Sequence, residues 1–311
     1  MEEPTNTSIG EEPIRDIRLE PGIYDLTPEI REHIIAGKPL ADETANILRT
    51  FNDQYSFEDD IKKRGRDVVL AELDRAQESF DFETAKVAVR KGIEIAQQIN
   101  PDIPIKPFPV IFLFIPNQGD AKSLHGQGCG INIDALRNRR VSEDLPEQKI
   151  LSFTAHEATH TFLRQLDRHP KPGNRSWRRV ALDFIWEEGL TTYVEPTHYL
   201  PHEAVESDGE FWVDIINRWY SSTSDEDARQ IYAEIKERAS FQTWYKYMYY
   251  NQPIPEDLDL SEENFQKMLK YRNGIGYHVG SYLWKKQIEK GADLKDLVMA
   301  GSQNVEEWMR R

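Results

Sequence analysis

Two histidines one helical turn apart are the residues best suited to chemistry in this chain. They are His156 and His160 in the segment HEATH, and Glu157 directly follows the first. Residues at i and i+4 of an α-helix share a face about 5–6 Å apart at Cβ, so both imidazoles can bind one Zn²⁺ ion. Glu157 lies about 100° further round the helix, where it can take a proton from the zinc-bound water without binding the ion. This spacing predicts two zinc ligands and a general base.

The residues around HEATH indicate that the helix carrying it is buried. A helix is predicted from Pro146 to Leu166. The plain alternative is a pair of histidines on an exposed, charged face, which the apolar neighbours disfavour. Buried imidazoles beside a carboxylate need a partner that offsets their lost hydration, and a metal ion is the simplest one. The apolar neighbours are Ile150, Leu151, Phe153, Ala155, Phe162 and Leu163.

A catalytic zinc site needs a third protein ligand and an open position. The metzincin pattern HExxHxxGxxH is not met, because Leu163 and Leu166 occupy its glycine and histidine positions. A second helix is predicted from Ser176, a suitable N-cap, to Glu195, which precedes a proline. This second helix contains WEEGLTTY, residues 186–193, and its glutamates are the next candidates.

The two adjacent glutamates of that segment lie on different faces of the predicted helix. Glu188 shares a stripe with inward-type residues, whereas Glu187 lies on a more mixed face beside Asp183. A carboxylate on an apolar stripe needs a cation. Periodicity therefore favours Glu188 as the third ligand and leaves Glu187 as the alternative. The inward-type residues are Trp177, Ala181, Phe184 and Ile185.

These motifs together resemble the gluzincins, the thermolysin-like clan of zinc metallopeptidases. In the aminopeptidase branch of that clan, the glutamate directly before the glycine of the second helix is the third ligand, and the matching residue is Glu188. The resemblance is closest to predicted zinc-dependent proteases, whose motifs run in the order that this chain shows as GQGCGINID, HEATH, EGLTTY and GYHVG. It covers roughly residues 105–300 and implies a zincin-like fold, bound Zn²⁺ and hydrolysis of peptide bonds.

Peptide hydrolysis also builds negative charge on the carbonyl oxygen, and a tyrosine or histidine usually helps the metal to stabilise it. The segment NGIGYHVGSYLW offers Tyr277 and His278. The Gly-Tyr-x-x-Gly pattern of the resembling proteases favours Tyr277, with His278 as the second choice and a packed core tyrosine as the plain alternative. Gly276 and Gly280 are one turn apart and allow another helix to approach closely.

The chain departs from the clan in two places. Some members carry an acid four residues after the ligand glutamate, where it orients a histidine, and Thr192 stands there in this chain. The Gly-x-Met-Glu-Asn signature of the aminopeptidases is absent as well. The resemblance therefore does not imply attack at a free N-terminus.

The glycines of GQGCGINID indicate a turn and not a phosphate loop. A dinucleotide site needs a strand, then glycines, then a helix, whereas the β-type residues Ile131 to Ile133 follow here. We expect the turn to lead into an edge strand, which can pair with an extended peptide beside the zinc.

Composition limits the partners and the compartment. The chain has 54 acidic and 39 basic residues and a formal charge of −15, which disfavours binding to nucleic acid and to anionic membranes. Cys129 is the only cysteine, so an internal disulfide framework and a multi-cysteine zinc module are excluded. No export signal or membrane span is evident, and we expect a cytoplasmic protein.

The sequence thus predicts an α+β fold of three parts. Residues 1–22 form a disordered acidic N-terminus and residues 23–104 a helical N-terminal region, with helices over residues 23–37, 60–80 and 82–99. Residues 105–311 form a zincin-like domain. That domain has a strand over 109–116 in a small mixed or antiparallel sheet, then helices that include the HExxH helix and two segments from about 262 to 311.

The predicted function is that of a zinc metallopeptidase acting on a peptide or protein substrate. Water bound to the zinc attacks the peptide bond after activation by Glu157. The alternatives are a non-catalytic, zinc-stabilised interaction or chaperone-like module and a zinc hydrolase of another amide or ester. The intact Glu157 disfavours the first of these, because a structural site closes all four ligand positions and needs no base. The sequence gives no indication of the oligomeric state.

Overall fold

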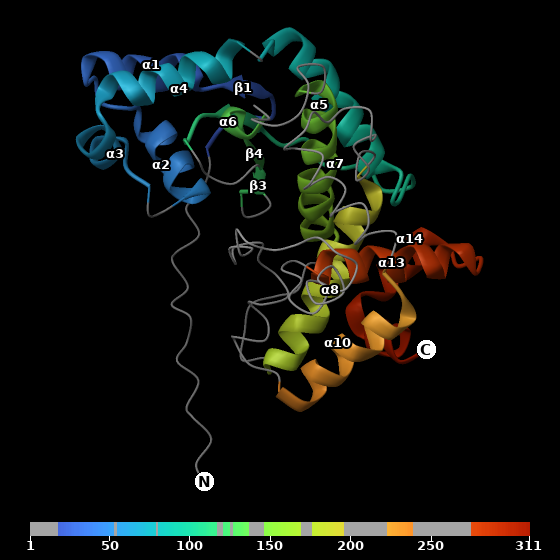
Figure 1. Ribbon diagram of the computed structural model, residues 1–311. Helices are drawn as coiled ribbons and strands as arrows, with labels where there is room; N and C mark the ends of the chain where they lie inside the picture. Colours follow the sequence, from blue (N-terminus) through green and yellow to red (C-terminus); the bar gives the residue numbers. More distant parts are fainter. Residues whose placement is uncertain are drawn as a thin grey trace.

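The computed structural model describes residues 18–52, 55–78, 80–116, 121–124, 127–136, 146–168, 176–195, 223–238 and 275–311. Helices dominate and surround one small sheet, so the predicted α+β class is confirmed (Figure 1). Most of the acidic N-terminus predicted to be disordered lies outside these residues. Residues 18–22 belong to no helix or strand.

The N-terminal part is helical after one short strand. Its elements are β1 (Ile23–Asp25), α1 (Thr27–Ala36), α2 (Asp42–Phe51), α3 (Phe57–Arg64), α4 (Arg66–Glu78) and α5 (Phe82–Gln97). The predicted helix over residues 23–37 was wrong at its start, because Ile23 to Asp25 pair with a later strand. The predicted helix over 60–80 is divided at Gly65, whose φ of 93° lies in the left-handed region that glycine adopts readily.

The sheet is mixed and has the strand order β1-β2-β4-β3, with β2 at Val110–Leu113, β3 at Ala121–Ser123 and β4 at Cys129–Asn132. β2 runs parallel to both β1 and β4, whereas β3 runs antiparallel to β4. The predicted edge position of the strand in GQGCGINID was wrong: β4 lies inside the sheet, and the short strand β3 takes that edge. The sequence does not predict β3, because its three residues are too few to show an alternating pattern.

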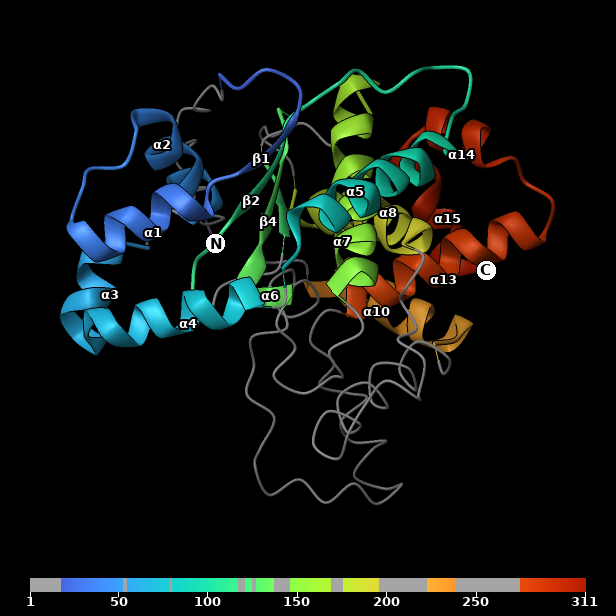
Figure 2. The ribbon, with the colours of Figure 1, turned by 90° about the horizontal axis from the view of Figure 1, so that it is seen from above.

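Helices cover both faces of the sheet. In Figure 2, α1 and α4 lie on one side of β1, β2 and β4, and α5 and α7 lie on the other. Every residue of β2 and β4 is accordingly buried. This burial explains why the strand in PFPVIFLFIP is a continuous apolar run instead of an alternating one.

The C-terminal part contains the helices that carry the motifs. It comprises α6 (Ile133–Leu136), α7 (Pro146–Gln165), α8 (Trp177–Val194), α10 (Asp225–Arg238), α13 (Ile275–Glu289), α14 (Leu294–Ala300), the 3-10 helix η2 (Ser302–Asn304) and α15 (Val305–Arg310). The side chain of Ser176 caps α8, as predicted, by accepting a hydrogen bond from the Arg179 backbone N–H. The two predicted C-terminal segments are three α-helices and η2 from residue 275 onward, and residues 262–274 lie outside the described part.

Helix α7 passes from one hydrophobic core into a second. Ile150 and Ala158 belong to a core that includes α1 to α5 and the sheet. Phe162 and Leu163 belong to a core formed with α8, α10, α13 and the C-terminal helices. The HEATH segment therefore lies where the two cores meet.

Candidate metal centre

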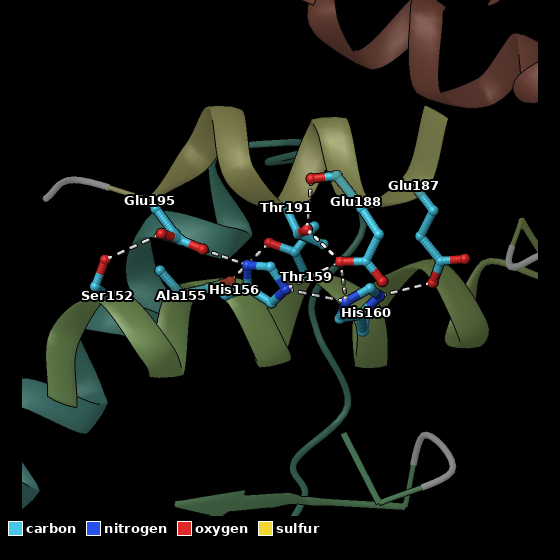
Figure 3. Close-up of polar contacts among 9 residues, drawn as sticks. All are labelled: Ser152, Ala155, His156, Thr159, His160, Glu187, Glu188, Thr191 and Glu195. Carbon is cyan, nitrogen blue, oxygen red and sulfur yellow. Dashed lines mark hydrogen bonds and ion pairs between the residues drawn. The ribbon is translucent and has the colours of Figure 1, made fainter. Parts of the chain in front are cut away.

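His156, His160 and Glu188 converge on one point between α7 and α8. The Nε2 atoms of the two histidines are 3.2 Å apart. Oε2 of Glu188 is 3.3 Å from Nε2 of His156 and 3.4 Å from Nε2 of His160. The three predicted ligands thus form a nearly equilateral triangle of donor atoms (Figure 3).

The dimensions and chemistry of this triangle fit a tetrahedral zinc ion. Ligands bound at about 2.0–2.1 Å in a tetrahedron lie about 3.3–3.4 Å from one another. The three observed edges of 3.2, 3.3 and 3.4 Å match that spacing. At this separation the lone pairs of both Nε2 atoms can share one cation. Two imidazoles and a carboxylate are also a donor set that zinc accepts, with a fourth position left for another ligand.

Each histidine is oriented by a further glutamate on its other ring nitrogen. Nδ1 of His160 lies 2.7 Å from Oε1 of Glu187, and Nδ1 of His156 is hydrogen-bonded to the carboxylate of Glu195. A carboxylate only accepts, so each ring carries a proton on Nδ1 and points Nε2 at the centre. Figure 3 shows the five side chains in a row between the two helices.

The carboxylates control the charge of the histidines when no cation is bound. Burial would lower the pKa of His156, but the charge of Glu195 and hydrogen bonds with Glu188 and Glu195 offset this and raise it to about 10. Burial likewise opposes the charged form of His160, and Glu188 and Glu187 raise its pKa well above the usual value. For Glu188, burial would raise the pKa, but the two histidines hold it far below the usual range. The carboxylates therefore favour positive charge at the point where the three side chains meet.

Glu157 is buried beside the triangle without being part of it. Burial raises its pKa, and the charges of His156 and His160 and the backbone N–H of Ser123 act in the opposite direction. Ser123 is the last residue of β3, so this hydrogen bond brings Glu157 toward the edge of the sheet. The side chain thus lies between the two histidines and the edge strand.

Glycines allow close helix crossings behind both ligand-bearing helices. A Cβ atom on Gly92 of α5 would lie 2.7 Å from Cβ of Thr154, two residues before His156. Where α8 crosses α13, a Cβ atom on Gly189 would lie 2.4 Å from Cα of Gly280. Gly280 therefore permits the close approach that was predicted for it, directly next to Glu188.

A hydrogen bond and aromatic packing hold α13 against α8 near the same point. Nε1 of Trp284 donates to the carbonyl oxygen of Trp186 at 2.8 Å, and the two rings pack with centroids 5.8 Å apart. Trp186 directly precedes Glu187. The backbone of α8 is thus fixed on both sides of the two glutamates that face the histidines.

Tyr277 lies on α13 and packs against α8. Its half-buried ring meets Phe184 edge-on with centroids 5.3 Å apart. Phe184 is one helical turn before Glu188, so Tyr277 contacts α8 close to Glu188. His278, the second choice, is buried. The oxyanion role of Tyr277 stays a prediction.

The orienting roles of Glu187 and Glu195 are not predicted by the sequence. Periodicity makes Glu187 an alternative to Glu188 as a ligand, and the position four residues after Glu188 is occupied by Thr192. The acid that bonds to His156 is instead Glu195, seven residues after Glu188 and thus on the same helix face. Its place on that face, one turn further along, is the signal in the sequence that points to it.

No protein-family model, curated protein or solved structure matches this chain. Among the described residues, no helix is both long enough and apolar enough to cross a bilayer. The resemblance to the gluzincins therefore remains a prediction carried by the motifs.

Proposed function

We propose that this protein is a zinc metallopeptidase of the gluzincin type. The observation that carries the proposal is the triangle of His156, His160 and Glu188, whose edges match those of a tetrahedral zinc site. Glu157 stands beside it as the predicted general base. The motif order supports a zincin-like arrangement of the region that starts at residue 105.

Three protein ligands would leave the fourth position of a tetrahedral zinc ion open for water or substrate. A zinc ion held there would supply a Lewis acid that lowers the pKa of a coordinated water and polarises a carbonyl group. Glu187 and Glu195 keep the two imidazoles in the correct tautomer and orientation, which typically contributes about 10–100-fold to metal affinity. The described carboxylates thus both attract the cation and order its ligands.

Glu157 is suited to moving protons in this reaction. Its burial raises its pKa toward the range in which a carboxylate can accept a proton and return it. In the proposed reaction, Glu157 takes a proton from the attacking water and delivers it to the leaving amine nitrogen. The hydrogen bond from the Ser123 backbone N–H orients the carboxylate for both steps.

The edge strand β3 offers a place for the substrate backbone. β3 pairs with β4 through one side, and within the described residues no strand pairs with its other side. Its last residue contacts Glu157, so an extended peptide added to this edge would run past the general base. This geometry favours a peptide over a compact amide or ester as the substrate.

Metal analysis and peptide cleavage test the proposal together. The protein purified without chelators should contain about one zinc per chain and cleave members of a peptide library. A chelator should abolish cleavage, and added zinc should restore it. Glu157→Gln should retain zinc and lose nearly all cleavage, because this side chain acts on water and does not hold the ion.

A glutamate on the exposed face of the same helix provides the matched control. Glu147→Gln removes one charge from α7 far from the triangle and should leave zinc content and cleavage unchanged. Absence of zinc uptake by the wild-type protein would refute the metal site. Stoichiometric zinc without cleavage of any library peptide would refute the peptidase and favour the non-catalytic module or a hydrolase of another amide or ester.

A further inference from the structure

Arg164 lies on the same helix as the two histidines, and no other described residue forms a hydrogen bond or an ion pair with its side chain. It is on α7, four residues after His160 and seven after Glu157, and its side chain is half-buried. Its Nε atom is buried and has no hydrogen-bond partner. Within the described part of the chain, no carboxylate forms an ion pair with its guanidinium.

Other half-buried arginines of this protein are paired. The Arg64 guanidinium binds both Asp60 and Glu72, and Arg178 binds Glu306. Leaving a buried donor unsatisfied typically costs about 1–3 kcal/mol, and more for a charged group. A native structure that keeps such a group calls for an explanation such as a bound ligand.

The surroundings of Arg164 connect it to the proposed active site. Burial lowers its pKa, and the charges of Glu187, Glu157 and Glu188 oppose that effect, so the guanidinium lies within electrostatic range of the carboxylates near the histidines. Side chains on a helix lean toward its N-terminus, so Arg164 leans back toward His160. None of the three carboxylates is near enough to pair with it directly, and Glu187 is already bound to His160.

We propose that Arg164 binds a carboxylate group of the peptide substrate next to the scissile bond. This inference rests on the proposed function, because it specifies which substrates the same site prefers. A guanidinium presents a planar fork that binds a carboxylate through two parallel hydrogen bonds. The rest of the protein carries a large negative charge, so an acidic group can be accepted only where a local cation receives it. Arg164 therefore determines the preference of the site for peptides with a carboxylate next to the scissile bond.

The carboxylate that Arg164 binds can be the C-terminus of the peptide or an acidic side chain. Matched peptides distinguish these two sources. One series shares a cleaved sequence and ends shortly after the scissile bond with either a free carboxylate or a carboxamide. A second series is amidated throughout and carries Glu or Gln directly after the scissile bond. The kcat/KM values of each pair, measured with the zinc-loaded protein, report the preference for a terminal or a side-chain carboxylate.

Substitution of Arg164 should remove that preference. We expect the wild-type protein to favour the carboxylate member of one pair about 10–100-fold, as for a hydrogen bond to a charged group. Arg164→Gln should lower kcat/KM for the carboxylate peptide about 10–100-fold more than kcat/KM for its neutral counterpart, mainly by raising KM. Arg164→Lys should restore part of the preference, because it keeps the charge but not the fork. Arg168→Gln, which removes an exposed charge just beyond the same helix, should keep the preference.

A binding measurement separates this inference from the proposed function. An N-acetylated dipeptide with a free C-terminus and its carboxamide are titrated calorimetrically into zinc-loaded Glu157→Gln protein, with and without Arg164→Gln. Carboxylate binding that depends on Arg164 supports the inference even if no peptide is cleaved. Cleavage without any preference for a carboxylate, or an equal effect of Arg164→Gln on charged and neutral peptides, refutes the inference and leaves the peptidase intact. Zinc content and melting temperature of each variant show that it has folded.

Discussion

Substituting Gly280 with alanine tests whether the crossing of α8 and α13 positions Glu188, the predicted third ligand. The added Cβ atom would lie 2.2 Å from the carbonyl oxygen of Ile185 and 2.5 Å from Cα of Gly189. Ordinary contacts between nonbonded carbon atoms are about 3.5–4.0 Å. Both obstacles are backbone atoms of α8, so no side-chain rotation relieves them, and the helices must separate by about 1 Å or more.

The expected cost follows from two opposing effects. Alanine is about 1 kcal/mol better than glycine inside a helix. Overpacking a well-packed interior costs typically about 1–3 kcal/mol, occasionally more, and a clash with rigid backbone belongs at the upper end. We therefore expect Gly280→Ala to lower the free energy of unfolding by about 1–2 kcal/mol, which corresponds to about 1.5–3 °C in melting temperature for a protein of this size.

The same displacement should reach the metal site. Gly189 is the neighbour of Glu188, so moving α8 shifts Oε2 relative to the two Nε2 atoms. Metal sites tolerate deviations of only about 0.2 Å in ligand distance. We expect the zinc affinity of Gly280→Ala to fall about 10–100-fold, by analogy with the loss of orienting groups around metal ligands.

Two measurements on the same protein check this prediction. Urea unfolding of the metal-free protein reports the change in stability, and competition with a coloured chelator reports the zinc affinity. The control is Lys285→Ala, an exposed position on α13, which should change stability by less than about 0.5 kcal/mol and leave zinc affinity unaltered. A Gly280→Ala protein that matches this control in both measurements would refute the role assigned to the crossing.

Four further outcomes are expected. Glu187→Gln and Glu195→Gln should each weaken zinc binding about 10–100-fold in competition titrations, and an unaffected variant would remove that glutamate from the set that orients the histidines. Tyr277→Phe should lower kcat about 10²–10³-fold with unchanged zinc content, whereas an unaltered kcat would leave Tyr277 as a packing residue against Phe184. Removing zinc should lower the melting temperature, with a stabilisation of about 2.7 kcal/mol at a free zinc concentration of 100 Kd, and calorimetry at several zinc concentrations should show this dependence in the wild type. Hydrogen bonds from Arg64 lower the pKa of Asp60, so Asp60→Asn should destabilise the protein by about 1.5–3 kcal/mol at pH 7. This difference in the free energy of unfolding should disappear as the pH falls from about 4 through the lowered pKa of Asp60. Urea unfolding at several pH values measures the difference, and a value independent of pH would exclude the charge of Asp60 as its cause.

The sequence by itself predicted the long helices and the three side chains that converge between α7 and α8. HEATH lies inside α7, and EGLTTY lies inside α8, because each segment combines helical periodicity with clear start and stop residues. The i and i+4 spacing of His156 and His160 fixes both side chains on one face of α7, and the apolar stripe of α8 favours Glu188 as their partner. Such local information determines which side chains share a face of one helix.

Local sequence patterns did not predict the strand order or the short strands. β3 has three residues and β1 has three, too few for a period to be read, and β1 begins a stretch that otherwise looks helical. The position of β4 inside the sheet depends on its parallel pairing with β2, a strand that is separated from it in sequence by the whole of β3. No local pattern specifies such partners, because pairing is decided by the burial of whole faces.

Only the tertiary structure decided how the site is supported. Periodicity left Glu187 as the alternative to Glu188 for a single role. In the structure both contact the histidines: Glu188 faces the two Nε2 atoms, and Glu187 binds Nδ1 of His160. The same crossing brings Glu195 to His156 from the end of α8. These roles depend on the relative rotation and spacing of two helices, which their packing against α5 and α13 determines and which neither helix specifies alone.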